Sequence, residues 1–245
     1  MQIGVIGAGN MARALARGWG EPVLATDAGS GRAQALVDEL GGTALLSNAE
    51  LAEQADLIVL ACKPYQLGSI AGEISGSAKR VLSVLGGTRV ADLEVAFPTS
   101  EIYLTIPNTP VEVRRGITLV AEETPLAEDV RELLERVGTV VVLPEHLLGT
   151  GGAATSCAPA YVALVAEAMV DAAVKHGIKT ALATELVIAL LAGSAELLRA
   201  RGGDTLAVRR EVTSPGGSTA RGLDALEQAG LRNAFMDAME AVKRG

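Results

Sequence analysis

The sequence predicts an α/β protein, with a doubly wound parallel sheet in residues 1–150 and an all-helical region in residues 151–245. Three observations lead to this prediction. Short apolar runs alternate with helix-like segments through the first region, which is the pattern of strands and covering helices in a parallel sheet. A glycine-rich turn joins the first apolar run to the first helix-like segment. Beyond Gly149 the strand pattern stops, and long helix-like segments follow.

The composition limits the classes of function. The chain has 245 residues, a formal net charge of -8 and 2% aromatic residues. Such an acidic chain has few rings for stacking on bases, so we expect a small-molecule substrate and no nucleic acid partner. Cys62 and Cys157 lack the spacing of a disulfide framework or a metal site, so we expect reduced thiols and no metal.

The start of the chain and its apolar runs predict a location. The first predicted strand begins at the first residues, which leaves no room for a signal peptide. No uncharged apolar run reaches the length of about 20 residues that crosses a bilayer. We therefore expect a cytoplasmic protein without a membrane partner.

The first strand, turn and helix predict a dinucleotide site. The run QIGVI at residues 2–6 predicts a strand, and residues 13–19 predict a helix. Between them, Gly7 permits a tight turn, Gly9 lets the backbone approach a pyrophosphate, and Ala12 lets helix and strand pack closely. The N–H groups at the start of the helix then face the phosphates, as in a Rossmann fold. The candidate cofactor residues in this turn are Gly7, Gly9, Asn10 and Met11.

The end of the second predicted strand, at residues 23–26, bears on the choice of cofactor. Asp27 lies about twenty residues beyond the first glycine, where an acid binds the ribose hydroxyls of NAD. Ser30 and Arg32 follow, and they are suited to the 2′-phosphate of NADP. The two signals conflict, and a purely structural acidic turn before a helix is a third interpretation.

Helices and strands continue to alternate after this point. Residues 32–40 predict a helix that stops at Gly41-Gly42, and Ser47-Asn48 caps a short helix at residues 49–54. The further strands are expected at residues 57–61, 80–85, 102–105, 118–121 and 140–143.

Two proline-containing segments follow strands of this sheet. Ligands of doubly wound sheets bind at the carboxyl ends of strands, so Ala61, Lys63 and Pro64 are candidate cofactor residues. The second segment, Pro-Asn-Thr-Pro at residues 107–110, cannot lie inside a helix. It is either an ordinary turn or a rigid loop that presents Asn108, a further candidate cofactor residue, and its neighbouring threonine.

The last third of the sequence is helical. The run GTGGAATSCA at residues 149–158 favours a flexible junction, and Thr155 or Ser156 is a candidate cap for the next helix. Beyond this junction we expect one helix that ends at His176. Three more helices are expected at residues 180–201, 206–211 and 219–239. The helix at residues 180–201 is apolar on nearly every side and needs to be buried. We therefore predict a homodimer that interlocks through the C-terminal helices, with a higher homo-oligomer left open.

The order of motifs GAGNMA, CKP, PNTP, APAY and VTSPGGSTARGLDALE resembles the pyrroline-5-carboxylate reductase family over essentially the whole chain. The resemblance implies reduction of the C=N bond of 1-pyrroline-5-carboxylate, a cyclic imine amino acid, to L-proline by NADP or NAD in its reduced form. The chain departs from the family pattern at Leu104, where arginine is common, and at Thr155-Ser156-Cys157-Ala158, where Ser-Gly-Ser-Gly is common. A different imine or 3-hydroxyacid reductase and a non-enzymatic dinucleotide sensor are the alternatives.

The resemblance also implies a substrate site in the segment SPGGST, which begins at Ser214. Consecutive N–H groups of Gly217, Ser218 and Thr219 would form an anion nest for the substrate carboxylate, helped by the Ser214 hydroxyl and flanked by Val212. The Thr219 hydroxyl would then bind the ring nitrogen, as the catalytic contact. The alternative is that these hydroxyls only cap a helix. A protonated imine needs no strong general acid, which fits a sequence without a catalytic histidine or carboxylate pair.

Overall fold

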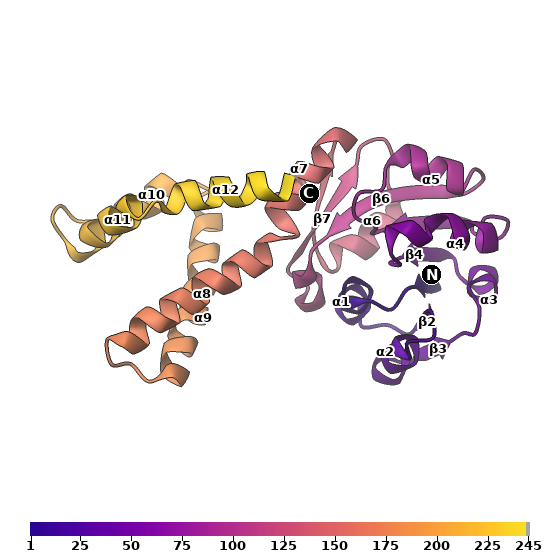
Figure 1. Cartoon of the computed structure of the whole chain (residues 1–245), viewed down its shortest axis with the longest axis horizontal. Helices are drawn as coiled ribbons and strands as arrows, with labels where there is room; N and C mark the ends of the chain where they lie inside the picture. The colour runs from indigo at the N-terminus through magenta and orange to yellow at the C-terminus, as the bar shows by residue number, and fades with distance from the viewer. Residues whose placement is uncertain (244–245) are drawn as a thin grey trace. The chain divides into compact units, whose positions relative to one another are not determined.

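The computed structural model describes residues 1–243 and has two compact units, Met1–Pro159 and Ala160–Gly245 (Figure 1). The first unit carries an eight-stranded sheet with helices on both faces. The described residues of the second unit form helices and connecting turns. The predicted fold class is confirmed.

The sheet of the first unit has the strand order β3-β2-β1-β4-β5-β6-β7-β8. Its direction of winding reverses between β1 and β4, which is the point where doubly wound sheets bind their ligands. The strands are β1 (Ile3–Ile6), β2 (Val23–Thr26), β3 (Gly42–Ala44), β4 (Leu57–Leu60), β5 (Arg80–Ser83), β6 (Glu101–Pro107), β7 (Gly116–Ala121) and β8 (Gly138–Leu143).

The structure corrects the predicted sheet in two places. Strand β3 is missing from the prediction because it has three residues and begins at Gly42, one of the two glycines expected only to stop a helix. Strand β7 pairs antiparallel with β6, whereas the alternation of elements predicted a fully parallel sheet. The connection between these two strands holds only the short 3₁₀ helix η2 (Thr109–Val113), so no crossover helix is available to keep the strands parallel.

The helices of the first unit lie in two layers on the sheet. One apolar core lies between the sheet and α1, α2 and α6, and two further cores lie between the sheet and α3, α4, α5 and α7. The helices are α1 (Asn10–Trp19), α2 (Arg32–Leu40), α3 (Asn48–Gln54), α4 (Leu67–Ile74), α5 (Val90–Ala96), α6 (Glu128–Glu135) and α7 (Glu145–Thr155), with a 3₁₀ helix η1 (Pro64–Gln66) before α4.

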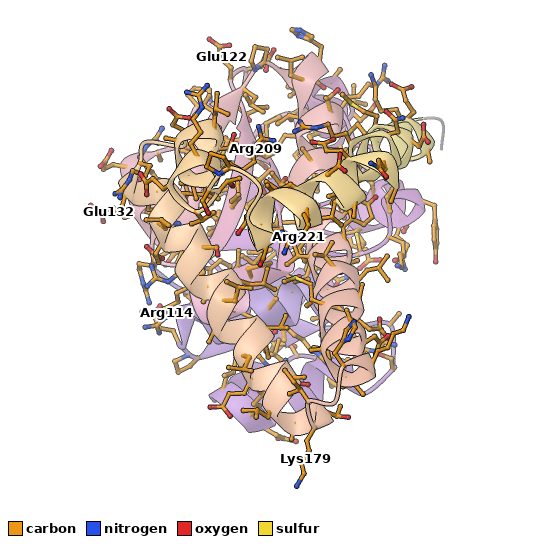
Figure 2. All side chains as sticks on the ribbon, turned by 90° about the vertical axis from the view of Figure 1, so that its left-hand side faces the viewer. Arg114, Glu122, Glu132, Lys179, Arg209 and Arg221 are labelled. Atoms are coloured by element: carbon orange, nitrogen blue, oxygen red, sulfur yellow. The ribbon has the colours of Figure 1, made fainter. Side chains whose placement is uncertain are left out.

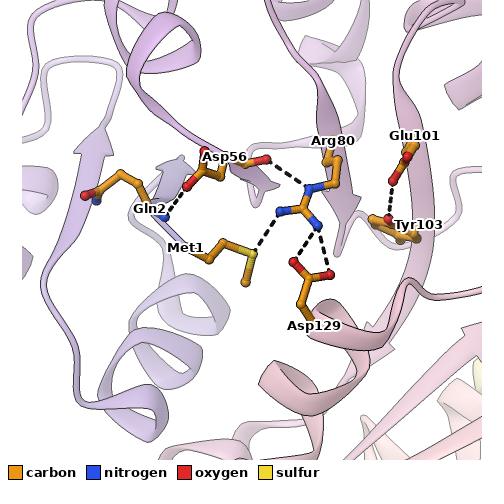
Figure 3. A network of polar contacts seen from close by, with 7 residues as sticks. All are labelled: Met1, Gln2, Asp56, Arg80, Glu101, Tyr103 and Asp129. Carbon is orange, nitrogen blue, oxygen red and sulfur yellow. Dashed lines mark hydrogen bonds and ion pairs between the residues drawn. The ribbon is translucent and has the colours of Figure 1, made fainter.

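A polar network ties together the amino ends of several strands, away from the carboxyl ends where ligands bind (Figure 3). The Asp56 carboxylate accepts a hydrogen bond of 2.7 Å from the Gln2 N–H, and the Asp56 carbonyl accepts one from the Arg80 side chain. The same guanidinium donates to both oxygens of Asp129 at 2.9 and 2.7 Å and holds the pKa of that carboxyl below its usual range. The network therefore joins the starts of β1 and β5 to α6 at the end of the sheet where these strands begin.

The segment of tiny residues at 149–158 is not a flexible junction, because most of it belongs to helix α7. A side-chain carbon built at Gly151 would lie 2.7 Å from the side chain of Leu119, so the small residue allows close packing of the helix on the sheet. The Thr155 hydroxyl donates to the Gly151 carbonyl, and the Ser156 hydroxyl donates to the Pro107 carbonyl. Neither hydroxyl caps the next helix, contrary to the prediction.

The helices α8 (Ala158–Lys175), α9 (Thr180–Ala200) and α10 (Thr205–Glu211) agree closely with their predicted ranges. The segment predicted as one helix at residues 219–239 is instead two helices, α11 (Ser218–Gln228) and α12 (Leu231–Lys243). Gly230 separates them with a φ of +79°, a left-handed conformation that ends a helix and that glycine adopts readily.

Helix α9 buries little of its apolar surface within its own unit. Only Ala183 and Val187 are buried, whereas the side chains of Leu186, Ile188 and Leu190 are half or more exposed. The segments Glu145–Lys175 and Thr180–Ala200 are also long and apolar enough to cross a membrane by length and composition alone. Both segments contain polar and charged residues, so they do not contradict the expectation that no uncharged apolar run is long enough.

Candidate functional site

A cavity of about 840 Å³ opens at the carboxyl ends of β1, β2, β4 and β5, at the point where the winding of the sheet reverses. This is the position at which doubly wound folds bind dinucleotides. Ten of the eleven predicted cofactor residues line this cavity. They are Gly7, Gly9, Asn10, Met11, Asp27, Ser30, Arg32, Ala61, Lys63 and Pro64.

The turn between β1 and α1 has the shape that a pyrophosphate needs. Gly7 has a φ of +93°, and a side-chain carbon there would lie 2.8 Å from the Ala61 carbonyl, so this position requires glycine. Gly9 is the residue that caps α1, and within residues 1–243 no side chain accepts a hydrogen bond from the first turn of that helix. The N–H groups of Asn10 and Met11 are therefore available to a phosphate, with the positive end of the helix dipole behind them.

Asp27 serves its own loop. Its carboxylate accepts hydrogen bonds from the N–H groups of Gly29, Ser30 and Ala33 and from the Ser30 hydroxyl, at distances between 2.8 and 3.0 Å. Burial acts to raise the pKa of Asp27, but these hydrogen bonds outweigh it and hold the pKa below its usual range. The carboxylate thus caps the start of α2 and stabilises the loop before it.

Arg32 differs from Asp27 in that its side chain is exposed. Within residues 1–243, no ion pair or side-chain hydrogen bond of Arg32 is formed. It lines the cavity together with Ser30, at the end of β2 where the adenosine part of a dinucleotide lies in this fold. A free guanidinium at this position is suited to an anionic group.

Asn48 and Glu73 are cavity residues that the sequence did not reveal. The expected cap pair divides its tasks, because the Ser47 hydroxyl accepts from the Glu50 N–H and the Asn48 side chain is left for other contacts. Asn48 accepts a hydrogen bond of 2.6 Å from the Thr26 hydroxyl and donates one of 2.8 Å to Glu73. An asparagine directly after a capping serine was the only signal in the sequence.

The loop after β4 brings Lys63 and Pro64 to the cavity. The Lys63 N–H donates to the Gln66 side chain at 3.0 Å, which fixes the start of η1. Cys62 also lines the cavity as a free thiol, and burial raises its pKa above the usual value. The exposed ring of Tyr65 lies at the same wall and was not predicted as a site residue.

Asn108 is the predicted cofactor residue that does not line the cavity. Its side chain is buried, donates to the Thr155 carbonyl at 3.1 Å and accepts from the Ile117 N–H at 2.8 Å. Both ends of the amide are thus engaged within the first unit. The residue connects β6, β7 and the end of α7, so the structure gives it a positioning contact rather than a free side chain.

The second unit holds the predicted substrate residues around one turn. Gly216 has a φ of +66°, Gly217 caps α11, and among the described residues no side chain accepts a hydrogen bond from the first turn of this helix. The alternative in which hydroxyls cap this helix is therefore wrong. The Gly217 N–H donates to the Ser214 carbonyl at 3.0 Å, so it is not one of the free donors expected. The free donors are those of Ser218, Thr219 and Ala220.

Arg221 adds a positive charge to this turn that the sequence analysis did not consider. Its guanidinium donates to the Gly216 carbonyl at 2.7 Å and lies 3.4 Å from the Ser218 hydroxyl. Figure 2 labels Arg221 beside the pale yellow ribbon of this segment. Val212, the remaining predicted substrate residue, follows α10 and is 56% exposed.

The donors of the two units are backbone amides, hydroxyls and guanidinium groups. Among residues 1–243, no group of three or more histidine, cysteine or acidic side chains is arranged to hold a metal ion. The arrangement is suited to binding anionic molecules and fixing their orientation.

Comparisons with known proteins give matches over both units of the chain. Residues 145–245 match the family described as pyrroline-5-carboxylate reductase dimerisation, and residues 2–87 match NADP oxidoreductase, coenzyme F420-dependent. The chain is 34% identical to the pyrroline-5-carboxylate reductase of Thermus thermophilus, over 100% of this chain and 97% of the relative. It is 32% identical to that of Synechocystis, over 100% and 96%.

The chain is also similar to solved structures of pyrroline carboxylate reductases. The crystal structure of Plasmodium falciparum pyrroline carboxylate reductase with NADP bound has a TM-score of 0.85 and 29% identity, over 99% of this chain and 95% of that chain. The Streptococcus pyogenes enzyme has a TM-score of 0.85 and 25% identity, over 100% and 99%. A 3-hydroxyisobutyrate dehydrogenase of Mycobacterium tuberculosis, at 13% identity and a TM-score of 0.52, shares the fold alone.

Proposed function

The chain belongs to the pyrroline-5-carboxylate reductase family, and from this premise we propose which of its residues bind the two reactants. It is an NAD(P)-dependent oxidoreductase that reduces the C=N bond of 1-pyrroline-5-carboxylate to give L-proline. The bound cofactor supplies the hydride. The chain's own residues hold the two reactants and stabilise their charges.

We propose that NADPH is the preferred electron donor. The N–H groups after Gly9 bind the pyrophosphate, and Ser30 and Arg32 bind the 2′-phosphate. Two observations support this assignment: the Asp27 carboxylate is saturated by its own loop, and the Arg32 guanidinium has no partner among the described residues. The similarity of residues 2–87 to an NADP oxidoreductase family is in agreement.

We propose that the turn before α11 binds the carboxylate of the substrate. The observation that carries this proposal is the first turn of α11, in which no side chain of the described residues accepts from the backbone N–H groups. These N–H groups point out of the N-terminal end of the helix and are available to an anion. Arg221, next to the Gly216 carbonyl, adds attraction for an anion and stabilises the turn. With the carboxylate bound there, the Thr219 hydroxyl hydrogen-bonds the ring nitrogen and fixes the orientation of the C=N bond.

The reaction does not require a strong general acid or base in this site. An imine that binds in its protonated form already carries an activated carbon, so the residues need only hold it and exclude other orientations. The Thr219 hydroxyl and the backbone N–H groups of α11 can do this without changing their own protonation.

Replacing Thr219 by alanine tests the assignment. We expect kcat/KM for 1-pyrroline-5-carboxylate to fall about fivefold or more, because one hydrogen bond is worth about 1 kcal/mol and more if a buried partner is left unpaired. The Kd of NADPH, measured by calorimetry, should be unchanged. Thr219→Ser keeps the hydroxyl and should retain most of the activity. Unchanged kinetics in Thr219→Ala would refute the role of this hydroxyl.

We also propose a homodimer through the C-terminal helices and a cytoplasmic location. The exposed apolar side chains of α9 need a protein partner, and residues 145–245 match the family's dimerisation region. A second copy of the chain, and not a membrane, covers the exposed apolar side chains of α9. The free thiols of Cys62 and Cys157 are in keeping with a reducing compartment.

A further inference from the structure

Starting from the proposed position of the adenosine at the end of β2, we propose that Glu73 is the carboxylate that sets the ratio of NADPH to NADH affinity. One of the interpretations that the sequence left open has Asp27 bind the ribose hydroxyls. The structure offers a second carboxylate, on helix α4, that lines the same cavity.

Asp27 cannot accept from a ribose without losing contacts of its own. Its two oxygens already receive four hydrogen bonds, three of them from backbone N–H groups of the loop and of α2. A ribose hydroxyl would have to displace one of these donors, and the loop would lose the contact that holds it. A second acceptor in the same place has no such cost.

A chain of hydrogen bonds links Glu73 to the end of β2. Thr26, the last residue of β2, donates to the Asn48 side-chain oxygen at 2.6 Å, and the Asn48 amide donates to Glu73 Oε2 at 2.8 Å. All three side chains line the cavity, and Thr26 directly precedes Asp27 in the sequence. The carboxylate is thereby tied to the end of β2, although it comes from α4.

The remaining oxygen of Glu73 gives it a chemical preference. Within the part of the chain that the structure describes, Oε1 accepts no hydrogen bond, so it can accept from a ribose hydroxyl. A 2′-phosphate at the same position carries about two negative charges and is repelled by the carboxylate. Arg32, which lines the same cavity, attracts that phosphate. Glu73 therefore limits the preference for NADPH and keeps NADH usable.

Replacing Glu73 by glutamine separates these effects. The glutamine side chain keeps one oxygen that accepts from Asn48, and its NH2 group can donate to a ribose hydroxyl, but the negative charge is removed. We expect the Kd of NADPH, measured by calorimetry on the full chain at low ionic strength, to fall about threefold to tenfold, and the gain to shrink as salt is added. The Kd of NADH should stay within about twofold. Glu53→Gln removes the same charge from exposed α3 outside the cavity, and both Kd values should be unchanged.

Three results would overturn the inference. Equal changes in both Kd values would mean that Glu73 only supports the shape of the cavity. Unchanged Kd values in Glu73→Gln, with NADPH still weakened by Arg32→Gln, would refute the role of Glu73 and leave the proposed adenosine position intact. Unchanged Kd values in both variants would refute that position as well.

Discussion

Replacing Asp27 by alanine removes the acceptor of four hydrogen bonds from a loop that lines the cofactor cavity. If the carboxylate serves the loop, as the structure indicates, the variant should lose stability and should bind NADH and NADPH less well by a similar factor. If the carboxylate reads the ribose instead, the loss should fall on NADH alone.

The size of the stability loss follows from the contacts. A hydrogen bond to a charged group contributes about 1.5–3 kcal/mol when it is buried, and the loss of a helix cap costs about 1 kcal/mol. The loop is largely exposed, so water replaces part of what each N–H loses, and the four contacts do not add fully. We therefore expect a loss of about 2 kcal/mol, or about 4–8 °C in Tm for a unit of this size.

The dependence on pH has a definite sign. The pKa of Asp27 is lowered in the folded chain, with burial opposing the shift and the hydrogen bonds from Ala33, Ser30 and Gly29 producing it. A carboxyl with a lowered pKa stabilises the fold above its unfolded pKa of about 4, and this contribution is lost as the pH falls through the lower, folded value. The difference between wild type and Asp27→Ala should be full at pH 6 and should shrink below about pH 4.

The chain offers a local probe for this measurement. Trp19 is the one tryptophan, it is 1% exposed, and its indole N–H donates to the Leu133 carbonyl, so its fluorescence reports unfolding of the first unit. Asp38→Ala is the matched control, because Asp38 lies exposed on α2 and, among residues 1–243, accepts a side-chain hydrogen bond only from Gln34. A loss in Asp27→Ala no larger than in this control, combined with weaker binding of NADH alone, would refute the assignment.

Two further predictions concern the second unit. Gly217→Ala should raise KM for 1-pyrroline-5-carboxylate several-fold without changing the Kd of NADPH, because the new carbon would lie 2.7 Å from the Ser214 hydroxyl and would distort the turn; Gly222→Ala, with open space around it, is the control for steady-state kinetics. Ile188→Asp should shift the chain from dimer to monomer in sedimentation experiments at micromolar concentration, whereas Ile188→Val should not, because a charge on the exposed apolar face of α9 opposes its burial. A dimer that persists in Ile188→Asp would place the interface elsewhere.

Local patterns predicted the parts of the fold that depend on local geometry. The turn at Gly7 requires a backbone conformation that glycine adopts readily, so the motif itself carried the information. The helix α9 has a long apolar pattern and clear glycine signals beyond its end, and its predicted range differs from the observed one by a single residue. The turn before α11 was recognised from its proline and two glycines.

Other features depend on partners that lie far away in the sequence. The antiparallel pairing of β6 with β7 depends on the short connection that η2 provides, which the strand pattern does not reveal. Glycines in α7 indicated flexibility, although Gly151 is small because Leu119 packs against it. Glu73 is one of many exposed acids in the sequence, and only its contact with Asn48 distinguishes it.

The single reversal between β6 and β7 determines where the chain leaves the sheet. In a parallel sheet, the helix after a strand runs antiparallel to it and returns to the end of the sheet where that strand began. Because β7 and β8 run opposite to β6, helix α7 runs in the same direction as β6, and its last turn reaches the segment after β6, where Asn108 donates to the Thr155 carbonyl. If β8 ran parallel to β6, helix α7 would end at the opposite end of the sheet, where the parallel strands begin. One inverted strand pair thus makes the outgoing chain exit on the side where the strands present their ligand-binding ends.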